Sequence, residues 1–214
     1  DSQIRWFLYV LIFSTIIVTF WQITINDQNL ITALRQSAFN VTSILTGTGY
    51  STTDYWAWGS FPVIIFLILM FVGGCSGSTS CSIKIFRYQI LYAAMRSQIE
   101  SLIRPHRVFV PHYNGEPISE NITDTVFAFF FLFLLLFALL TLALSILGLD
   151  FVTSISSAAT ALTNVGPGLG EVVGPAGNFS SLPSTAKWLL SFGMLVGRLE
   201  IFTVLVLFTK SFWR

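Results

Sequence analysis

The sequence predicts an all-α integral membrane protein built from two copies of one helical unit. Of the 214 residues, 54% are hydrophobic and only 10% are charged, whereas charged residues make up roughly a quarter of an ordinary soluble domain. The chain also contains apolar runs long enough for helices that cross a hydrocarbon core of about 30 Å. An internal repeat divides these runs between two units of the same design.

Four apolar segments are the candidate membrane spans. Residues 4–25 contain one charge, Arg5, and residues 125–149 contain none. Residues 61–72 and 184–208 are two further candidates, the first ending in glycines and the second interrupted by a charge. The alternative, a buried helix of a soluble protein, is disfavoured because a helix of this length normally has a polar face. We therefore expect four crossings.

Basic residues are distributed unevenly between the segments that join these spans. The segment between the second and third spans contains Lys84, Arg87, Arg96, Arg104 and Arg107. The other two connecting segments, 26–60 and 148–187, carry only Arg35 and Lys187. Because Lys and Arg stay on the cytoplasmic side of a membrane, we expect both chain ends and the middle segment to be cytoplasmic.

An internal repeat relates the two halves of the chain. SILTGTGY (43–50) and TALTNVGP (160–167) share the pattern Leu-Thr-x-x-Gly, and the same shift lays the first span on the third. Further along, MFVGG (70–74) aligns with MLVGR (194–198). Each half is therefore expected to consist of a span, a short helix, a glycine turn and a second span.

The short helices are expected at residues 29–44 and 151–162. Candidate capping residues at their starts are Asn29, Thr32 and Thr153. Each helix is too short to cross the membrane, and the two spans that flank it already begin and end on the same side of the membrane. We therefore expect the short helix to dip into the membrane without crossing it. Irregular backbone at that depth is tolerated only where it is buried in protein or lines a water-filled cavity. The segment ILTGTGYSTTDYW (44–56) is therefore expected to line a cavity.

The turn Thr48-Gly49-Tyr50 resembles the centre of the potassium-channel signature, in which backbone carbonyls replace a cation's water shell. Glycine permits the dihedral angles that turn successive carbonyls toward one axis. The carbonyl end of the preceding short helix favours a cation at the membrane centre. A single triplet of this kind is most often a plain surface turn, but its placement in both halves favours the cation site.

Several motifs together resemble a known family. The motifs LTGTGYST, LTNVGPG, GGCSGSTSCSIK and MLVGRLEIFTVLVLFTKSFWR resemble the membrane subunit of bacterial Trk potassium-uptake systems. The resemblance covers essentially the whole chain. It implies the last two of four span–pore-loop–span repeats around one pseudo-fourfold, potassium-channel-like pore. Residues 1–98 would be the third repeat with a broken second span, 99–120 a cytosolic linker, and 121–214 the fourth repeat.

The resemblance implies a potassium filter at the two glycine turns, with Gly49 and Gly166 as the matching glycines. Pro167 follows Gly166 where Tyr50 follows Gly49, so the carbonyl rings cannot be identical. The expected potassium ligands are the backbone carbonyls of Thr48, Gly49, Val165 and Gly166. The complete set of expected filter residues is Thr46, Gly47, Thr48, Gly49, Tyr50, Thr163, Asn164, Val165, Gly166 and Pro167.

Ten small residues in a row, GGCSGSTSCS (73–82), interrupt the second span. Gly73 and Gly77 form a GxxxG pattern, which is often a helix-packing face, but the low helix propensity of glycine and serine favours an unwound loop. In the resembled family the corresponding segment lies under the filter and acts as a gate. The expected gate residues are Gly73, Gly74, Cys75, Ser76, Gly77, Ser78, Thr79, Ser80, Lys84 and Arg198.

Arg198 lies about halfway along the fourth apolar segment, where a cationic side chain costs at least ~2.5–3.5 kcal/mol. Glu200 does not obviously neutralise it, because residues two apart on a helix face different ways. One interpretation is a structural contact with another helix or with loop carbonyls. In the repeat alignment, however, Arg198 takes the place of Gly74, so it should reach the pore axis below the filter. The family's matching arginine is regarded as a barrier to passing cations.

The leading functional hypothesis is potassium uptake across the bacterial inner membrane, with no covalent chemistry. A membrane enzyme is disfavoured because neither His106 nor His112 lies in a span and Glu200 lacks an obvious partner. A non-conducting assembly or receptor subunit would give no reason for the paired Thr-Gly loops. A less selective sodium channel or symporter is a further alternative.

The resemblance also implies partners. A separate cytosolic ring of nucleotide-binding subunits, similar to TrkA, would dock on the basic segment 84–118 and control opening. Any NAD or ATP would bind that ring and not this chain. K⁺ is the expected bound ion, membrane lipid surrounds the spans, and the assembly is expected to be a homodimer without nucleic acid.

Overall fold

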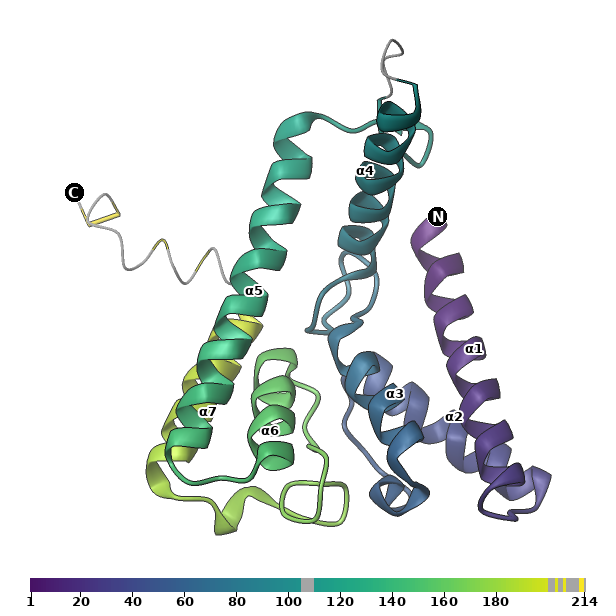
Figure 1. Ribbon diagram of the computed structural model, residues 1–214, viewed down its shortest axis with the longest axis vertical. Coiled ribbons are helices and arrows are strands. Elements are labelled where there is room, and N and C mark those ends of the chain that lie inside the picture. The colour runs from purple at the N-terminus through teal and green to yellow at the C-terminus, as the bar shows by residue number, and fades with distance from the viewer. Residues whose placement is uncertain (105–109, 200–202, 204–205, 207–211, 214) are drawn as a thin grey trace.

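The chain folds into helices joined by turns, irregular segments and one small hairpin (Figure 1). The computed structural model describes residues 1–104, 110–199, 203, 206, 212 and 213. Within them the α-helices are α1 (Ser2–Thr24), α2 (Leu30–Thr46), α3 (Ser60–Phe71), α4 (Ile85–Ile103), α5 (Glu120–Ile146), α6 (Phe151–Thr163) and α7 (Ser184–Arg198). The shorter elements are the 3-10 turns η1 (Tyr55–Trp58) and η2 (Phe179–Ser181) and the antiparallel strands β1 (His112–Tyr113) and β2 (Glu116–Pro117). The chain is thus mostly helical, as predicted, and the hairpin is a small exception.

Two helices in the described part of the chain are long and apolar enough to cross a membrane, Ser2–Thr24 and Asn121–Ile146. They coincide with the first and third predicted spans. Helix α3 has 12 residues and rises only about 18 Å, so it does not cross the hydrocarbon core by itself. The fourth predicted span begins as α7, and Glu200 lies outside the described residues.

Side-chain caps set the starts of both short helices. Asn29 accepts a hydrogen bond from the Ile31 amide at the start of α2 (3.3 Å), as predicted. Helix α6 is capped by Asp150, whose carboxylate accepts a hydrogen bond from the Thr153 amide (3.0 Å). The prediction of Thr153 as a cap is therefore wrong, and Thr32 likewise lies inside α2. An acidic side chain one residue before the helix satisfies an amide that has no helical partner.

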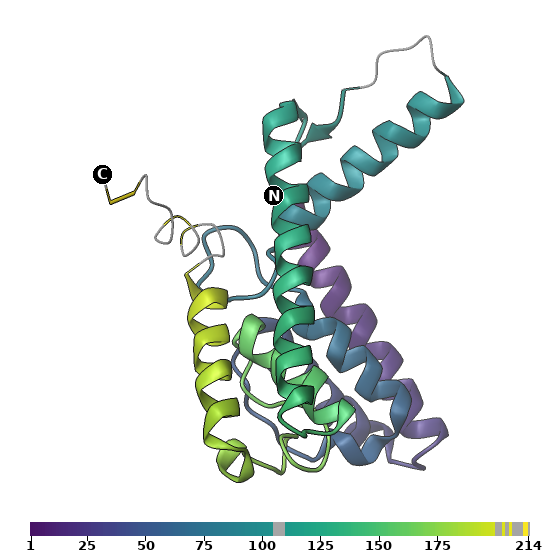
Figure 2. The same cartoon turned by 60° about the vertical axis from the view of Figure 1, so that its left-hand side comes forward.

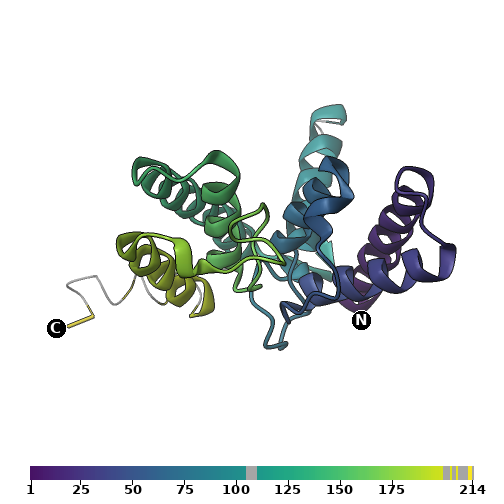
Figure 3. The ribbon, with the colours of Figure 1, turned by 90° about the horizontal axis from the view of Figure 1, so that it is seen from below.

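The order of long helix, short helix, irregular segment and helix occurs twice, as α1–α2–α3 and as α5–α6–α7. Figure 3 shows these as two groups of helices, with the segment that follows α6 lying between them. Helix α4 diverges from α5 toward its own C-terminal end, and the hairpin returns the chain to the start of α5 (Figure 2). That the two groups are repeats of a pore unit stays a prediction.

Helix α6 lies at the centre of the core because its side chains are small. Ten of its 13 residues are buried, and all of these except Leu162 are Ala, Ser or Thr. Neighbouring helices can therefore approach it closely, and it contacts α3, α5 and α7. A Cβ atom on Gly197 of α7 would lie 2.0 Å from the Leu162 carbonyl oxygen. Buried hydroxyls bond back to the helix, as Thr163 does to the Ala159 carbonyl (2.8 Å).

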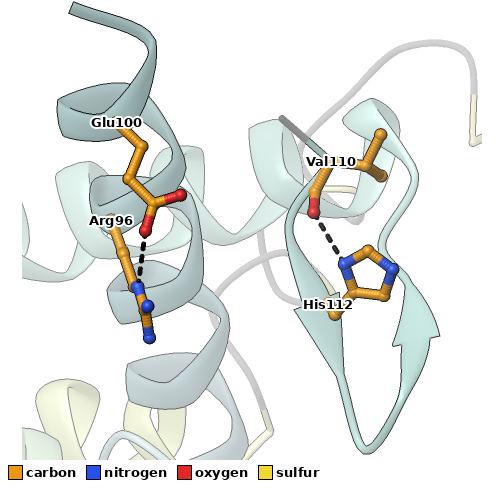
Figure 4. A network of polar contacts seen from close by, with 4 residues as sticks. All are labelled: Arg96, Glu100, Val110 and His112. Carbon is orange, nitrogen blue, oxygen red and sulfur yellow. Dashed lines mark hydrogen bonds and ion pairs between the residues drawn. The ribbon is translucent and has the colours of Figure 1, made fainter. Parts of the chain in front are cut away.

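Helix α4 continues through Ile103, past the boundary expected at residue 98. Arg96 and Glu100 form an ion pair one turn apart on this helix, with 2.9 Å between Nε and Oε1 (Figure 4). In the hairpin segment, His112 Nδ1 lies 2.7 Å from the Val110 carbonyl oxygen (Figure 4). The segment expected as a linker therefore contains regular structure, while His106 and Arg107 lie outside the described residues.

Candidate functional site

The two glycine turns lie against each other. Helix α2 ends at Gly47 (φ 69°) and α6 ends at Asn164 (φ 54°), both in the left-handed region. Gly49 (φ 77°) and Gly166 (φ 116°) follow them. A Cβ atom on Gly49 would lie only 2.1 Å from the Val165 carbonyl oxygen. Glycine is therefore required at position 49 for two reasons, its backbone angle and the space occupied by the facing turn.

Hydrogen bonds to the end of α2 orient the first turn. The amides of Thr48 and Gly49 both donate to the Ser43 carbonyl, at 2.9 and 3.4 Å. Because N–H and C=O point in opposite directions across a trans peptide, the carbonyls of Gly47 and Thr48 point away from the helix end. The side chains of Thr46, Thr48 and Tyr50 are exposed. The turn therefore presents oxygen atoms while the amides of Thr48 and Gly49 are occupied.

A hydroxyl of α6 orients the second turn. The Gly166 amide donates to Thr160 Oγ1 (2.9 Å), so the Val165 carbonyl on the same peptide points away from α6 and toward Gly49. Ser156 Oγ donates to the Leu169 carbonyl (2.9 Å) and holds the chain beyond the turn. The buried hydroxyls of α6 thus support the turn that follows it.

Residues 72–84 form a loop between α3 and α4. Val72 and Ile83 form an isolated parallel bridge, and the Gly73 amide donates to the Ile83 carbonyl (2.9 Å). The two ends of the loop therefore lie side by side. Gly73 and Gly77 do not lie on a helix, so the helix-packing alternative for the GxxxG pattern is wrong.

Two polar side chains connect this loop and α7 to the end of α6. Ser82 Oγ donates to the Met70 carbonyl (2.7 Å) and lies 3.3 Å from the Thr163 carbonyl. Asn164 Nδ2 donates to the Met194 carbonyl of α7 (3.1 Å). Ser82, which has φ 67°, was absent from the predicted gate residues. The sequence indicates a role for Ser82 only through its place at the end of the small-residue run. Its contact with Thr163 has no sequence signal, because Thr163 belongs to the other half of the chain.

Arg198, the last residue of α7, reaches the loop. One of its guanidinium nitrogens, Nη1, donates to the Thr79 carbonyl (3.2 Å) and lies 2.9 Å from Cys81 Sγ. The contact with a loop carbonyl agrees with the structural interpretation of Arg198. The same contact places the side chain on the loop that the gate interpretation requires.

The basic residues of α4 fall into two groups. Arg87 is buried, and its guanidinium carbon lies 3.8 Å from the centroid of the Phe129 ring on α5, a cation–π geometry. The Arg87 side chain therefore does not contribute its charge to an exposed docking surface. Arg96 and Arg104 are exposed.

The predicted residues thus gather in two connected places. Residues 46–50 and 163–167 meet at the glycine turns, while residues 73–80 and Lys84 belong to the loop on which Arg198 is docked. The contact between Ser82 and Thr163 joins the two places. The glycine turns, which present backbone oxygens, are therefore connected through the contact between Ser82 and Thr163 to the loop that Arg198 contacts.

Known proteins identify the fold and the family. The sequence profile described as TrkH, cation transport protein, matches residues 1–214. The chain belongs to the TrkH family. The description of this family as cation transport proteins, together with the two membrane-length apolar helices, indicates that this chain is part of a membrane protein.

Several TrkH-family relatives match the whole chain. The Trk system potassium uptake protein TrkI of Halomonas elongata is 52% identical over 214 residues, which are 100% of this chain and 43% of that protein. TrkH of Salmonella typhimurium is 37% identical over 216 residues, 44% of its length. The crystal structure of the potassium transporter TrkH from Vibrio parahaemolyticus has a TM-score of 0.92 and 32% identity, covering 100% of this chain and 45% of that one. This TrkH-family chain spans less than half the length of these relatives.

Proposed function

We propose that this chain forms part of the potassium-conducting pore of an uptake protein in the bacterial inner membrane. The observation that carries the proposal is the meeting of two glycine turns whose carbonyls point away from the helices that support them. The names of the relatives, a potassium uptake protein and a potassium transporter, support potassium as the ion. Because those relatives are more than twice as long, we assign the remaining pore-lining turns to the rest of the polypeptide.

The chemistry of the proposed filter is the replacement of water by backbone oxygen. The carbonyls of Thr48, Gly49, Val165 and Gly166 would coordinate the ion, which requires no carboxylate. Both short helices end at the turns, so their negative ends favour a cation there. The Ser43 carbonyl and the Thr160 hydroxyl keep amides of the turns occupied and thus prevent them from facing the ion.

A selectivity weaker than that of a symmetrical filter is part of this proposal. One turn is held by a backbone carbonyl of α2 and the other by a side chain of α6. Pro167 also follows Gly166 where Tyr50 follows Gly49. The two turns cannot place their oxygens identically, so sodium should be excluded less sharply than by four equal turns.

The loop at residues 72–84 and Arg198 are the proposed gate. The guanidinium of Arg198 is held by the Thr79 carbonyl. A fixed positive charge at ~6 Å from the ion path opposes a cation by about 2–3 kcal/mol at an effective dielectric near 20. Displacement of the loop with Arg198 would lower that barrier, and Ser82 would transmit the movement to the end of α6.

We further propose that the chain ends and α4 face the cytoplasm, where a TrkA-like ring of nucleotide-binding subunits docks on residues 84–118. The exposed Arg96 and Arg104 on the diverging end of α4 support a cytosolic docking surface. Arg87 does not contribute to it, because its side chain is buried. NAD or ATP would be bound by the ring, and the assembly would be a homodimer.

The function is tested with potassium and sodium uptake by the full-length protein in liposomes. Gly49→Ala should lower the preference for potassium, because a Cβ atom there meets the Val165 carbonyl. Gly148→Ala is the matched control: Gly148 also has a positive φ (88°), but nothing lies within 4 Å of its added Cβ atom. Loss of preference in both variants, or in neither, would contradict the proposed filter.

A further inference from the structure

A cavity beside the loop is lined mainly by basic and hydroxyl-bearing side chains. It has a volume of about 230 Å³, and its lining includes Lys84, Arg87, Arg198 and the residues Ser78, Thr79 and Ser80. Among the described lining residues there is no aspartate or glutamate. Phe129 and Phe133 of α5 form an apolar wall. The chemistry of the cavity is therefore that of an anion site.

Two of the basic groups are placed to contact a small anion. The half-buried Lys84 side chain forms no hydrogen bond or ion pair with the residues that the structure describes. Arg198 uses Nη1 for the Thr79 carbonyl, and a guanidinium has five N–H donors in all. Helix α4 begins at the cavity without a side-chain cap, so the positive end of its dipole adds to the potential there.

We propose that this cavity binds a phosphate-type anion, which goes beyond the proposed transport of potassium. Positive charges gathered in one cavity repel one another unless they are compensated, and oxyanions form short, charge-assisted hydrogen bonds with Lys and Arg. The hydroxyls of the loop supply further donors. The anion is either free phosphate from the cytosol or the headgroup of an anionic phospholipid. Its binding offsets the charge of Arg198 and so promotes passage of potassium.

Cys81 is a reporter for the proposed site because it lines the cavity, whereas Cys75 does not. The full-length protein, with every cysteine except Cys81 replaced by serine, is placed in phosphatidylcholine nanodiscs. The rate of Cys81 alkylation by N-ethylmaleimide is measured with inorganic phosphate or with chloride at equal ionic strength. A second arm uses phosphatidylglycerol nanodiscs without phosphate. This readout does not depend on conduction, so it can fail independently of the transport assay.

We expect phosphate in the first arm, or the lipid in the second, to slow alkylation, which also identifies the source of the anion. Lys84→Gln and Arg198→Gln should each weaken that protection about tenfold, the loss of one charge-assisted contact. Arg96→Gln, a control on the exposed part of the same helix as Lys84, should retain it. Absence of protection in both arms, or full protection in both Gln variants, would overturn the proposal.

Discussion

Ser82 offers a direct test of the coupling between the loop and the glycine turns. Its hydroxyl contacts the Met70 and Thr163 carbonyls, at 2.7 and 3.3 Å, and the substitution Ser82→Ala removes both contacts. A hydrogen bond contributes about 0.5–1.5 kcal/mol net. The serine hydroxyl has one proton to share between these two acceptors, so the docked loop should lose about 0.5–1.5 kcal/mol in total. Serine and alanine at position 82 both carry the free-energy cost of the left-handed backbone conformation. This cost therefore largely cancels when Ser82→Ala is compared with the wild type.

A loss of ~1.4 kcal/mol changes the ratio of docked to undocked loop about tenfold. Because the undocked loop carries the proposed barrier away from the ion path, Ser82→Ala should raise potassium flux by up to that factor when the wild type is mostly closed. The assay is ⁸⁶Rb⁺ uptake into liposomes containing the full-length protein, normalised to the amount of folded protein. The matched control is Ser191→Ala, which removes a hydroxyl bonded only within α7, to the Lys187 carbonyl (2.8 Å).

A second variant separates the hydrogen bonds from the backbone strain. Ser82→Gly also removes the hydroxyl but adopts φ 67° without strain. Because it relieves strain in the docked loop, it should raise flux less than Ser82→Ala does. The reasoning is refuted if Ser82→Ala folds normally and conducts no faster than Ser191→Ala.

Three further predictions address other parts of the molecule. Arg198→Ala should raise ⁸⁶Rb⁺ flux severalfold while Arg198→Lys retains most of the restraint; unchanged flux in a folded Ala variant would make Arg198 a structural residue only. Asp150→Ala should lower the free energy of unfolding by about 1 kcal/mol at neutral pH, through loss of the α6 cap. Hydrogen bonds from Thr153 hold the pKa of Asp150 below its ordinary value, so the stabilisation by this cap is present at neutral pH and is lost as pH falls below about 4. Thermal unfolding of the wild type and of Asp150→Ala at pH 7 and pH 3 measures this stabilisation. An equal difference in stability between the two proteins at both pH values would contradict the prediction. Reversing the charge of Arg96 and Arg104 should abolish co-purification of the nucleotide-binding ring, and undiminished recovery would exclude this face as its docking surface.

The length and composition of the apolar runs were sufficient to predict helices α1 and α5, because a span of about 20 uninterrupted apolar residues has few other structures available. The short helices followed from the repeat and from the glycines that end them. Asp150 could also have been recognised, since an acidic residue directly before a helix is a common cap. What these elements have in common is that their signals lie within one stretch of sequence.

Contacts between distant segments could not be predicted in this way. Arg87 counts as a cytoplasmic charge in a topology rule, yet it packs on the Phe129 ring because α5 passes close to the start of α4. The tie between Ser82 and Thr163 depends on how the two halves of the chain pack. The repeat placed Gly49 and Gly166 in equivalent positions, but only the packing of the halves brings the Val165 carbonyl against Gly49.

The bridge between Val72 and Ile83 separates the residues that fix the helical frame from the residues inside the loop. Because the bridge already closes the ends of the loop, the residues inside it can vary in number or kind at a small entropic cost, without changing where α3 ends or α4 begins. Natural selection could therefore alter the ease of opening in one lineage after another by changes inside this loop. The helical frame, and with it the proposed ion path, would be inherited intact.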